Sequence, residues 1–362
     1  MDTEQLYKVV SHFSVKGSVD AISALGNGLI NDTFKIKTKE TDRPDYVLQR
    51  INNKVFCDVE LLQHNIEAVT SHIRHKLKER KETDIERKVL RFIPAENGKT
   101  YWKDKADNYW RIAVFIPDAV TYEAVTPEYS YHAGKSFANF EALLVDIPDT
   151  IGETIPNFHN MELRNLQFQN AIDTNAAGRV KEVQNMIDEL QKHAYEMCKA
   201  ERMYREGILP KRICHCDTKV NNMMFDKEGH VLCVIDLDTV MPSFVFSDYG
   251  DFLRTGANTA AEDEQDLQKV SFDMQIFTAF TRGYIEGSHG FLTPIERDNL
   301  PYAAALFPYM QCVRFLTDYL NGDVYYKTKY KEHNLVRAKN QLYLFNDVLH
   351  HTEEMRSIIQ EL

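Results

Sequence analysis

The chain is 362 residues long, a length that ordinarily folds as two or three packed units and not around one core. Apolar residues make up 43% and charged residues 27%, which excludes a disordered or fibrous protein. The net charge of -11 argues against a nucleic-acid-binding surface, because phosphate backbones are held by clustered lysine and arginine.

The beginning of the chain predicts its location. The first residues, MDTEQLYKVV, lack a basic segment followed by an apolar run, and no long apolar stretch follows anywhere in the sequence. We therefore expect a cytoplasmic protein that does not contact a membrane. The cysteines are expected to be reduced, and residues 214–216 (CHC) lack the second ligand pair that a zinc site needs. Composition does not predict the oligomeric state.

The N-terminal third predicts a sheet that carries one long helix. Apolar residues recur at helical spacing over residues 5–14, and residues 23–53 predict two strands around a turn. Spacing of three and four over residues 58–77 predicts an amphipathic helix. Two further β-rich segments follow, at residues 88–93 and 109–116.

After Pro117 the pattern becomes mainly helical, as in residues 133–144. In this part, only residues 231–235 predict a buried strand. A short hinge near Pro117 would therefore divide the chain into an N-terminal lobe of residues 1–117 and a C-terminal lobe of residues 118–362.

Residues 215–222 carry the most informative motif, HCDTKVNN, and a hydrophobic strand ending at Asp236 follows it. Phosphoryl transfer requires an acceptor hydroxyl aligned with the γ-phosphate, and cations that neutralise the phosphate oxygens. Asp217 would accept a hydrogen bond from the acceptor hydroxyl. Asn222 and Asp236 would supply the hard oxygen ligands that Mg²⁺ prefers.

Neighbouring residues of this motif are expected to support it. His215 is expected to order the loop by hydrogen bonding and not to transfer a proton. Lys219 either approaches the phosphates or is a solvated surface lysine. Asp238 either contacts a second cation or is structural, and Asp248 and Asp251 are expected to brace the loop.

Residues 25–33, LGNGLINDT, lie between predicted strands of the first lobe. Paired glycines, Gly26 and Gly28, let a chain lie close to a ligand, and exposed backbone N–H groups can face phosphate. An ordinary turn would have the same composition, but the position before a strand favours a nucleotide-binding loop. Asn31 is included in this predicted site.

The motif pair resembles the catalytic and metal loops of the aminoglycoside phosphotransferase and choline kinase-like superfamily, which are distant structural relatives of protein kinases. The resemblance implies an α+β, two-lobed, protein-kinase-like fold with a small β-rich N-lobe and a large helical C-lobe. It also implies ATP as co-substrate, Mg²⁺ as cofactor, and adenine bound near the hinge at Phe115. The strand lysine of the kinases is missing, and alternation lets either Gln49 or Arg50 face the nucleotide, but not both.

A closer resemblance, to bacterial N-acetylhexosamine 1-kinases, covers most of the chain. It implies phosphorylation of the anomeric hydroxyl of N-acetylglucosamine or N-acetylgalactosamine, with Arg314 and Asp323 as sugar contacts. From the residues alone, Arg314 could equally form an internal ion pair. The segments that carry this resemblance are residues 26–33, 215–222, 234–242, 248–251 and 314–337.

Two alternatives remain open from the sequence. The acceptor could be another small alcohol, such as choline, homoserine, a pentose or an aminoglycoside. The missing lysine also allows a nucleotide-binding pseudokinase, although intact Asp217, Asn222 and Asp236 favour an enzyme. Protein kinase activity is disfavoured, since no Asp-Phe-Gly and Ala-Pro-Glu pair brackets an activation segment.

Overall fold

The computed structural model describes residues 3–26, 30–122 and 125–362. The chain forms two compact units, each built from separate segments. The first unit comprises residues 1–121, 146–156 and 223–241, and the second comprises residues 122–145, 157–222 and 242–362.

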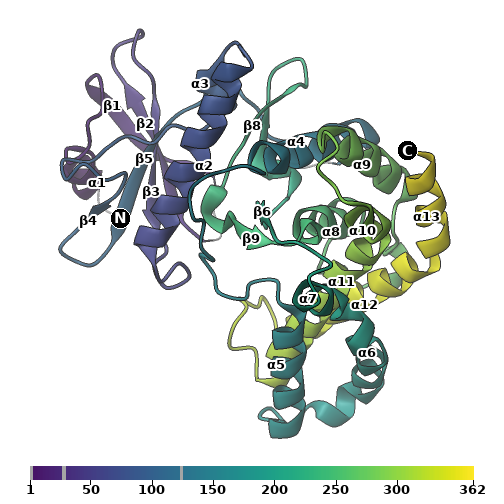
Figure 1. The fold of residues 1–362 in the computed structure, drawn as a ribbon. Helices are drawn as coiled ribbons and strands as arrows, with labels where there is room; N and C mark the ends of the chain where they lie inside the picture. The colour runs from purple at the N-terminus through teal and green to yellow at the C-terminus, as the bar shows by residue number, and fades with distance from the viewer. Residues whose placement is uncertain (1–2, 27–29, 123–124) are drawn as a thin grey trace. The chain divides into compact units, whose positions relative to one another are not determined.

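A five-stranded antiparallel sheet forms the centre of the first unit (Figure 1). Its strand order is β1-β2-β3-β5-β4. The strands are β1 (Val19–Ala24), β2 (Asp32–Thr38), β3 (Tyr46–Ile51), β4 (Trp102–Lys103) and β5 (Tyr109–Val114).

One face of this sheet is apolar and packs against α1 (Thr3–Val10), whose Leu6, Val9 and Val10 join a buried cluster with strand residues. Leu48 on β3 pairs with Ile112 on β5, and both side chains belong to this cluster. Gln49 pairs with Arg111 in the same register. Because side chains alternate along a strand, Gln49 and Arg111 lie on the opposite face.

The opposite side of the first unit contains α2 (Val59–Glu79). Asp58 caps the start of this helix, because its side chain accepts a hydrogen bond from the Leu61 backbone N–H. This helix lies beside η3 (Leu237–Thr239). The segment before η3 is a hairpin of β7 (Met223–Phe225) and β8 (Val231–Val234), and α3 (Ile85–Lys88) lies beside β8.

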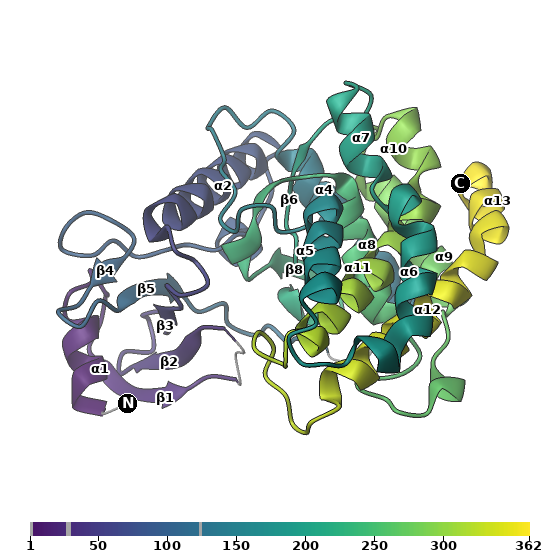
Figure 2. The same cartoon turned by 90° about the horizontal axis from the view of Figure 1, so that it is seen from below.

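The second unit is helical, and α11 (Leu300–Leu320) is its central element. Figure 2 shows α11 among α5, α8 and α12, and it contacts all three. The other elements are α4 (Pro127–Leu143), α5 (Met161–Thr174), η1 (Val180–Val183), α6 (Gln184–Met197), α7 (Lys199–Arg205), β6 (Arg212–Cys214), η2 (Val220–Asn222), α8 (Val245–Gly256), η4 (Leu267–Lys269), α9 (Met274–Gly287), α10 (Pro294–Asp298), α12 (His333–His350) and α13 (Thr352–Glu361). A further short strand, β9 (Met241–Ser243), spans the junction of the two units. Among the described residues, no helix is long and apolar enough to cross a membrane.

The strands at 32–38 and 46–51 and the helix at 59–79 confirm the sequence-based assignments for the first part of the chain. The strand predicted at residues 88–93 is wrong, since α3 ends at Lys88 and Phe92 forms only an isolated bridge to Ala113. The short strands β4, β6 and β7 were not predicted, because two or three residues are too few for alternation to be recognised.

The compact units do not follow the expected division at Pro117, because residues 146–156 and 223–241 pack with the N-terminal segment. Sequence patterning detects a change of secondary structure but not which later segments return to an earlier core. The division into functional lobes of residues 1–117 and 118–362 stays a prediction.

Candidate active site

The loop after β6 presents Asp217 through a tight backbone conformation. Cys216 has a φ of 63°, in the left-handed region that L-residues other than asparagine and aspartate rarely adopt. The backbone N–H of Asp217 donates to Nδ1 of His215 at 3.3 Å. Its side chain retains 19% exposure, whereas the residues around it are buried. Asp217 is therefore the accessible carboxylate of this loop.

Two aspartates of α8 hold this loop through its backbone. Asp248 accepts from the N–H groups of His215 and Cys216, each at 2.7 Å, and Asp251 accepts from the Thr218 N–H at 3.1 Å. Burial raises the pKa of Asp248 to about 6, while His215 and the two backbone donors oppose that rise. The predicted bracing role of Asp248 and Asp251 fits these contacts.

His215 orders the loop from within the core. Its ring is fully buried and lies edge-on to Phe137 and Phe140 of α4. Because Nδ1 contacts the Asp217 backbone N–H, Nε2 is the ring nitrogen that remains for another partner. This geometry fits the predicted ordering role.

Lys219 and Asn222 complete the loop. The Lys219 ammonium lies 2.8 Å from Oδ1 of Asp217 and 2.9 Å from Oδ2. The Asn222 Nδ2 donates to the Asp217 carbonyl at 2.8 Å, which turns the amide so that Oδ1 is the atom that can bind a cation. Lys219 therefore contacts the Asp217 carboxylate and is not a purely solvated side chain.

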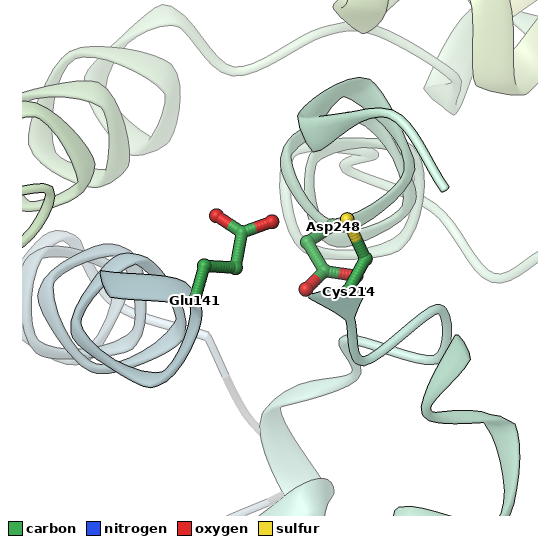
Figure 3. Close-up of side chains that lie close together, drawn as sticks. All are labelled: Glu141, Cys214 and Asp248. Atoms are coloured by element: carbon green, nitrogen blue, oxygen red, sulfur yellow. The ribbon is translucent and has the colours of Figure 1, made fainter. Parts of the chain in front are cut away.

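A buried acid cluster lies beneath the loop, formed by Glu141, Cys214 and Asp248 (Figure 3). Their possible ligand atoms lie within 4.8 Å of one another, as in a metal site. Burial raises the pKa of both Glu141 and Cys214 well above their usual values and so favours the protonated form of each. Because metal ligands must be deprotonated, this cluster fits a proton-sharing structural site better than a metal site.

Close to Asp217 lies a region that the sequence did not single out, centred on His159. Its Nδ1 lies 3.0 Å from Oγ of Ser247, and its ring stacks on Phe158. Burial, together with the positive charge of Arg314, lowers its pKa to about 3, and Asp217 opposes this shift. His159 is therefore neutral and lies within the electric field of both Asp217 and Arg314.

Arg314 on α11 lies among aromatic and amide groups. Its Nη1 donates to Oε1 of Gln311 at 3.1 Å, and its guanidinium lies 5.8 Å from the ring centroid of Phe158 and 5.7 Å from that of Tyr326. Gln311 also donates to the Tyr326 hydroxyl. Such a set of donors beside aromatic faces suits a polyhydroxylated ligand.

Asp323 is engaged in contacts that shape the loop after α11. Its Oδ2 lies 2.6 Å from Nη1 of Arg179, and its Oδ1 accepts from Nδ2 of Asn334 at 2.9 Å. The buried Asp318 accepts from the backbone N–H groups of residues 324–326. Asp323 is therefore part of the bracing of this loop, and its role as a sugar contact stays a prediction.

The predicted metal loop lies in the first unit, after β8. Asp236 has a φ of 60° and precedes η3. Asp238, 2% exposed, pairs with Nη1 of Arg111 at 2.6 Å and accepts from Nδ2 of Asn31 at 2.7 Å. Asp238 is thus a structural centre of the first unit. Asn222 belongs to the other unit, so a site shared by Asn222 and Asp236 stays a prediction.

The two candidates for the missing strand lysine lie on different faces of β3. Gln49 accepts from Nε of Arg111 at 3.0 Å and donates to Thr33 at 3.3 Å. Arg50 forms an ion pair with Asp32 on the neighbouring strand β2. Gln49 is therefore the residue on the face that leads to the metal loop.

The other residues predicted to bind the nucleotide differ in which of their atoms are already used in contacts. Gly26 has a φ of 69°, which favours glycine, whereas Gly28 lies outside the described residues. Both ends of the Asn31 amide are used, since Oδ1 accepts from the Asn52 backbone. The Phe115 N–H donates to the Asp45 carbonyl at 2.9 Å, so this group is not available to adenine. A nucleotide contact by Phe115 would have to use other atoms.

Residues 21–279 match a family described as the phosphotransferase enzyme family, which is most of the chain. The chain belongs to this family. The match includes the loop of Asp217, the metal loop with Asp236, and the bracing helix α8.

Solved structures of other phosphotransferases and kinases share the fold. Spectinomycin phosphotransferase, solved with ADP and spectinomycin, is 14% identical over 100% of this chain and 99% of its own, with a TM-score of 0.56. Amicoumacin kinase, solved with AMP-PNP and Ca²⁺, is 10% identical over 100% and 94%, with a TM-score of 0.60. A microcompartment-associated aminopropanol kinase is 15% identical over 98% and 99%, with a TM-score of 0.60. The predicted fold class, an α+β kinase-like fold with a small sheet lobe and a helical lobe, is confirmed.

Within the second unit, the loop of residues 215–222 brings Asp217, Lys219 and Asn222 together, and the charges of Asp217 and Arg314 both act on the His159 ring. Two residues were missed, His159 and Arg111. Neither belongs to a motif, and only the aromatic pair at residues 158–159 within a polar loop was a sequence signal for the first. Arg111 looked like an ordinary polar residue in a strand.

Proposed function

We propose that this protein transfers the γ-phosphate of ATP to the anomeric hydroxyl of an N-acetylhexosamine, with Mg²⁺ as cofactor. The observation that carries the proposal is the arrangement around His159. The carboxylate of Asp217 and the guanidinium of Arg314 both act on this ring, so the predicted base and the predicted sugar contact share one region of the second unit.

In this proposal, Asp217 accepts a hydrogen bond from the anomeric hydroxyl and orients its oxygen for in-line attack. Lys219, which lies on Asp217, would offset negative charge as the phosphoryl group arrives. No covalent intermediate on the protein is needed. His215 and Asp248 act through the backbone by fixing the direction of the Asp217 side chain.

The donor set fits a hard divalent cation. Asn222 presents an amide oxygen and Asp236 a carboxylate, both of which Mg²⁺ accepts. When bound, the cation would neutralise charge on the phosphate oxygens. The Ca²⁺ and the nucleotide analogue in amicoumacin kinase support a divalent cation and a nucleotide, because that protein has the same fold.

The environment of Arg314 also favours a neutral acceptor over an amine. The guanidinium of Arg164 lies close enough to lower the pKa of His159, and Arg314 contributes to a lowered pKa of Arg164 itself. Two cations near the acceptor would repel choline or an aminoglycoside, whereas they can donate to the carbonyl and hydroxyl oxygens of an N-acetylated sugar.

The test is release of ADP from Mg-ATP with N-acetylhexosamines, free hexoses, choline, homoserine and aminoglycosides. We expect activity with N-acetylhexosamines only. Asp217→Asn should lower kcat by about 10² to 10⁴-fold, the range for loss of a positioned base. Asp188→Asn, an exposed aspartate on α6, is the matched control and should retain full activity.

Each other result has a defined meaning. Turnover of a different acceptor would reject the N-acetylhexosamine proposal and keep the kinase. Nucleotide binding without turnover of any acceptor would favour a pseudokinase. Activity that is equal in Asp217→Asn and the wild type would remove Asp217 from the mechanism.

A further inference from the structure

The first unit lacks the strand lysine of the kinases, so other residues have to hold the predicted metal loop with Asp236. In protein kinases, this lysine pairs with a glutamate on the following helix and contacts the phosphates. Here Glu60 and Glu67 of α2 are used elsewhere. Glu60 pairs with Lys99 at 2.7 Å, and Glu67 accepts from the Thr100 hydroxyl.

A buried arginine lies beside the strand position from which the lysine is missing. Arg111 on β5 is the register partner of Gln49 and is only 3% exposed. Its Nε donates to Gln49, and its Nη1 lies 2.6 Å from Oδ1 of Asp238. Gln49 on β3 therefore occupies the strand position of the missing lysine, and Arg111 on the neighbouring β5 supplies the positive charge.

Asp238 transmits this contact to the metal loop. It lies two residues after Asp236, and its backbone carbonyl accepts from Thr154 Oγ1 at 2.9 Å. Val240, two residues further on, has its carbonyl held at 3.0 Å by Asn65 of α2. The loop that carries Asp236 is thus fixed by β5 through a charge pair, and by α2 through an amide.

The chemistry of this pair indicates more than stability. Two charges removed from water contribute little more to stability than apolar side chains of the same volume. The Arg111 guanidinium, however, donates from Nε to Gln49 while its Nη1 is in ion-pair contact with Asp238, so it links the two side chains in one arrangement. The pair is therefore suited to positioning the residues that follow β8.

We propose that Arg111 replaces the strand lysine as a positioning residue: by holding Asp238, it sets the orientation of Asp236 toward the divalent cation that accompanies the nucleotide. The inference rests on the proposed function for the identity of that cation. It assigns a role to Arg111, Asp238 and Gln49 without requiring any of them to contact the phosphates.

The test measures the Mg²⁺ concentration that gives half-maximal binding of a fluorescent ATP analogue, together with the melting temperature. Arg111→Met should raise this concentration by about tenfold or more, as loss of a residue that orients a metal ligand does. Adding Gln49→Lys to Arg111→Met restores a cation in the strand slot. The double variant should return to within about threefold of the wild type.

Two further variants keep the test informative. Arg111→Lys keeps the charge and the fold but loses the planar guanidinium with its several N–H donors, and should also raise the Mg²⁺ requirement. Arg43→Met removes an exposed arginine that pairs with Asp42 in the turn before β3, and should leave the requirement unchanged. An unchanged requirement in folded Arg111→Lys would overturn the inference. Recovery of the melting temperature by Gln49→Lys without recovery of the Mg²⁺ requirement would also overturn it.

The binding assay needs no acceptor, so the two proposals can fail separately. If Arg111 controls the Mg²⁺ requirement but no sugar is phosphorylated, the inference stands and the proposed function falls. If N-acetylhexosamines are phosphorylated while the Arg111 variants bind the analogue with the Mg²⁺ requirement of the wild type, the inference falls and the function stands.

Discussion

Protonation of Glu141 is expected to control the stability of the protein around the loop of residues 215–222. It is 2% exposed, accepts from the Tyr284 hydroxyl, and lies beside Cys214 and Asp248. Burial, together with the charge of Asp248, raises its pKa well above the usual 4.5. The native protein therefore keeps this proton at pH values where the unfolded chain has released it.

This linkage fixes the sign of a pH effect. The contribution of Glu141 to stability is fully present below pH 4.5 and is lost as the pH rises toward the raised pKa of the folded state. The loss is about 1.4 kcal/mol per pH unit for one proton. Glu141→Gln keeps a neutral side chain at every pH, so its stability should fall less than that of the wild type between pH 5 and pH 7.

Urea unfolding at pH 5 and pH 7 measures this difference, followed by far-UV circular dichroism. Glu128→Gln, an exposed glutamate on the same helix α4, is the control and should follow the wild type at both pH values. Parallel pH dependence in the wild type and Glu141→Gln would show that Glu141 is ionised in the folded protein.

At the scale of elements, three glycines let α4 and α9 cross closely. A Cβ at Gly134 would lie 2.1 Å from the Phe280 carbonyl oxygen, and one at Gly283 would lie 2.0 Å from that of Tyr131. Gly287 meets Lys135 in the same way. Backbone atoms cannot move aside as a side chain can, so the helix pair depends on these positions.

Gly283→Ala should therefore destabilise the protein, by at least about 3 kcal/mol, because α9 would have to move away from α4. Arg282→Ala changes the adjacent, exposed position and should stay within about 0.5 kcal/mol of the wild type. Thermal melting of both variants checks this prediction. A Gly283→Ala protein as stable as the control would mean that the two helices are not in this close contact in solution.

The elements that were predicted from sequence are those with a long pattern. The helix of residues 59–79 spans several turns of apolar spacing, and the strands at 32–38 and 46–51 flank a turn with proline. The loop of residues 215–222 was recognised because its chemistry is contiguous. The pairing of β3 with β5 joins residues about sixty positions apart, so Arg111 had no local pattern to reveal it.

At the scale of the whole molecule, the first unit is not contiguous in sequence. Its residues 146–156 and 223–241 follow long excursions into the second unit. Asn65 donates to Gly152 and Val240, and Arg111 pairs with Asp238, so two buried polar groups depend on these returning segments. Without them, an unpaired charge and an unsatisfied amide would remain in the core.

A fragment of residues 1–121 is therefore expected not to fold by itself. Its circular dichroism should show no cooperative melting under conditions in which the full chain melts cooperatively. The full chain, measured in parallel, is the control. Cooperative unfolding of the isolated fragment would instead indicate that the N-terminal segment is a domain of its own, as the division at residue 117 suggested.

The sequence by itself determined the class of fold and the family, because the resemblance that implies them is carried by motifs whose side chains are close along the chain. The catalytic roles that it predicts for the loop of residues 215–222 stay predictions. It also indicated that either Gln49 or Arg50, but not both, faces the nucleotide where the strand lysine is missing. Only the tertiary structure decided that Gln49 faces Arg111, that Arg111 pairs with Asp238, and that the charges of Asp217 and Arg314 both act on His159. These contacts join distant segments, and a side chain's burial and partners are set by packing, which no local pattern of residues specifies.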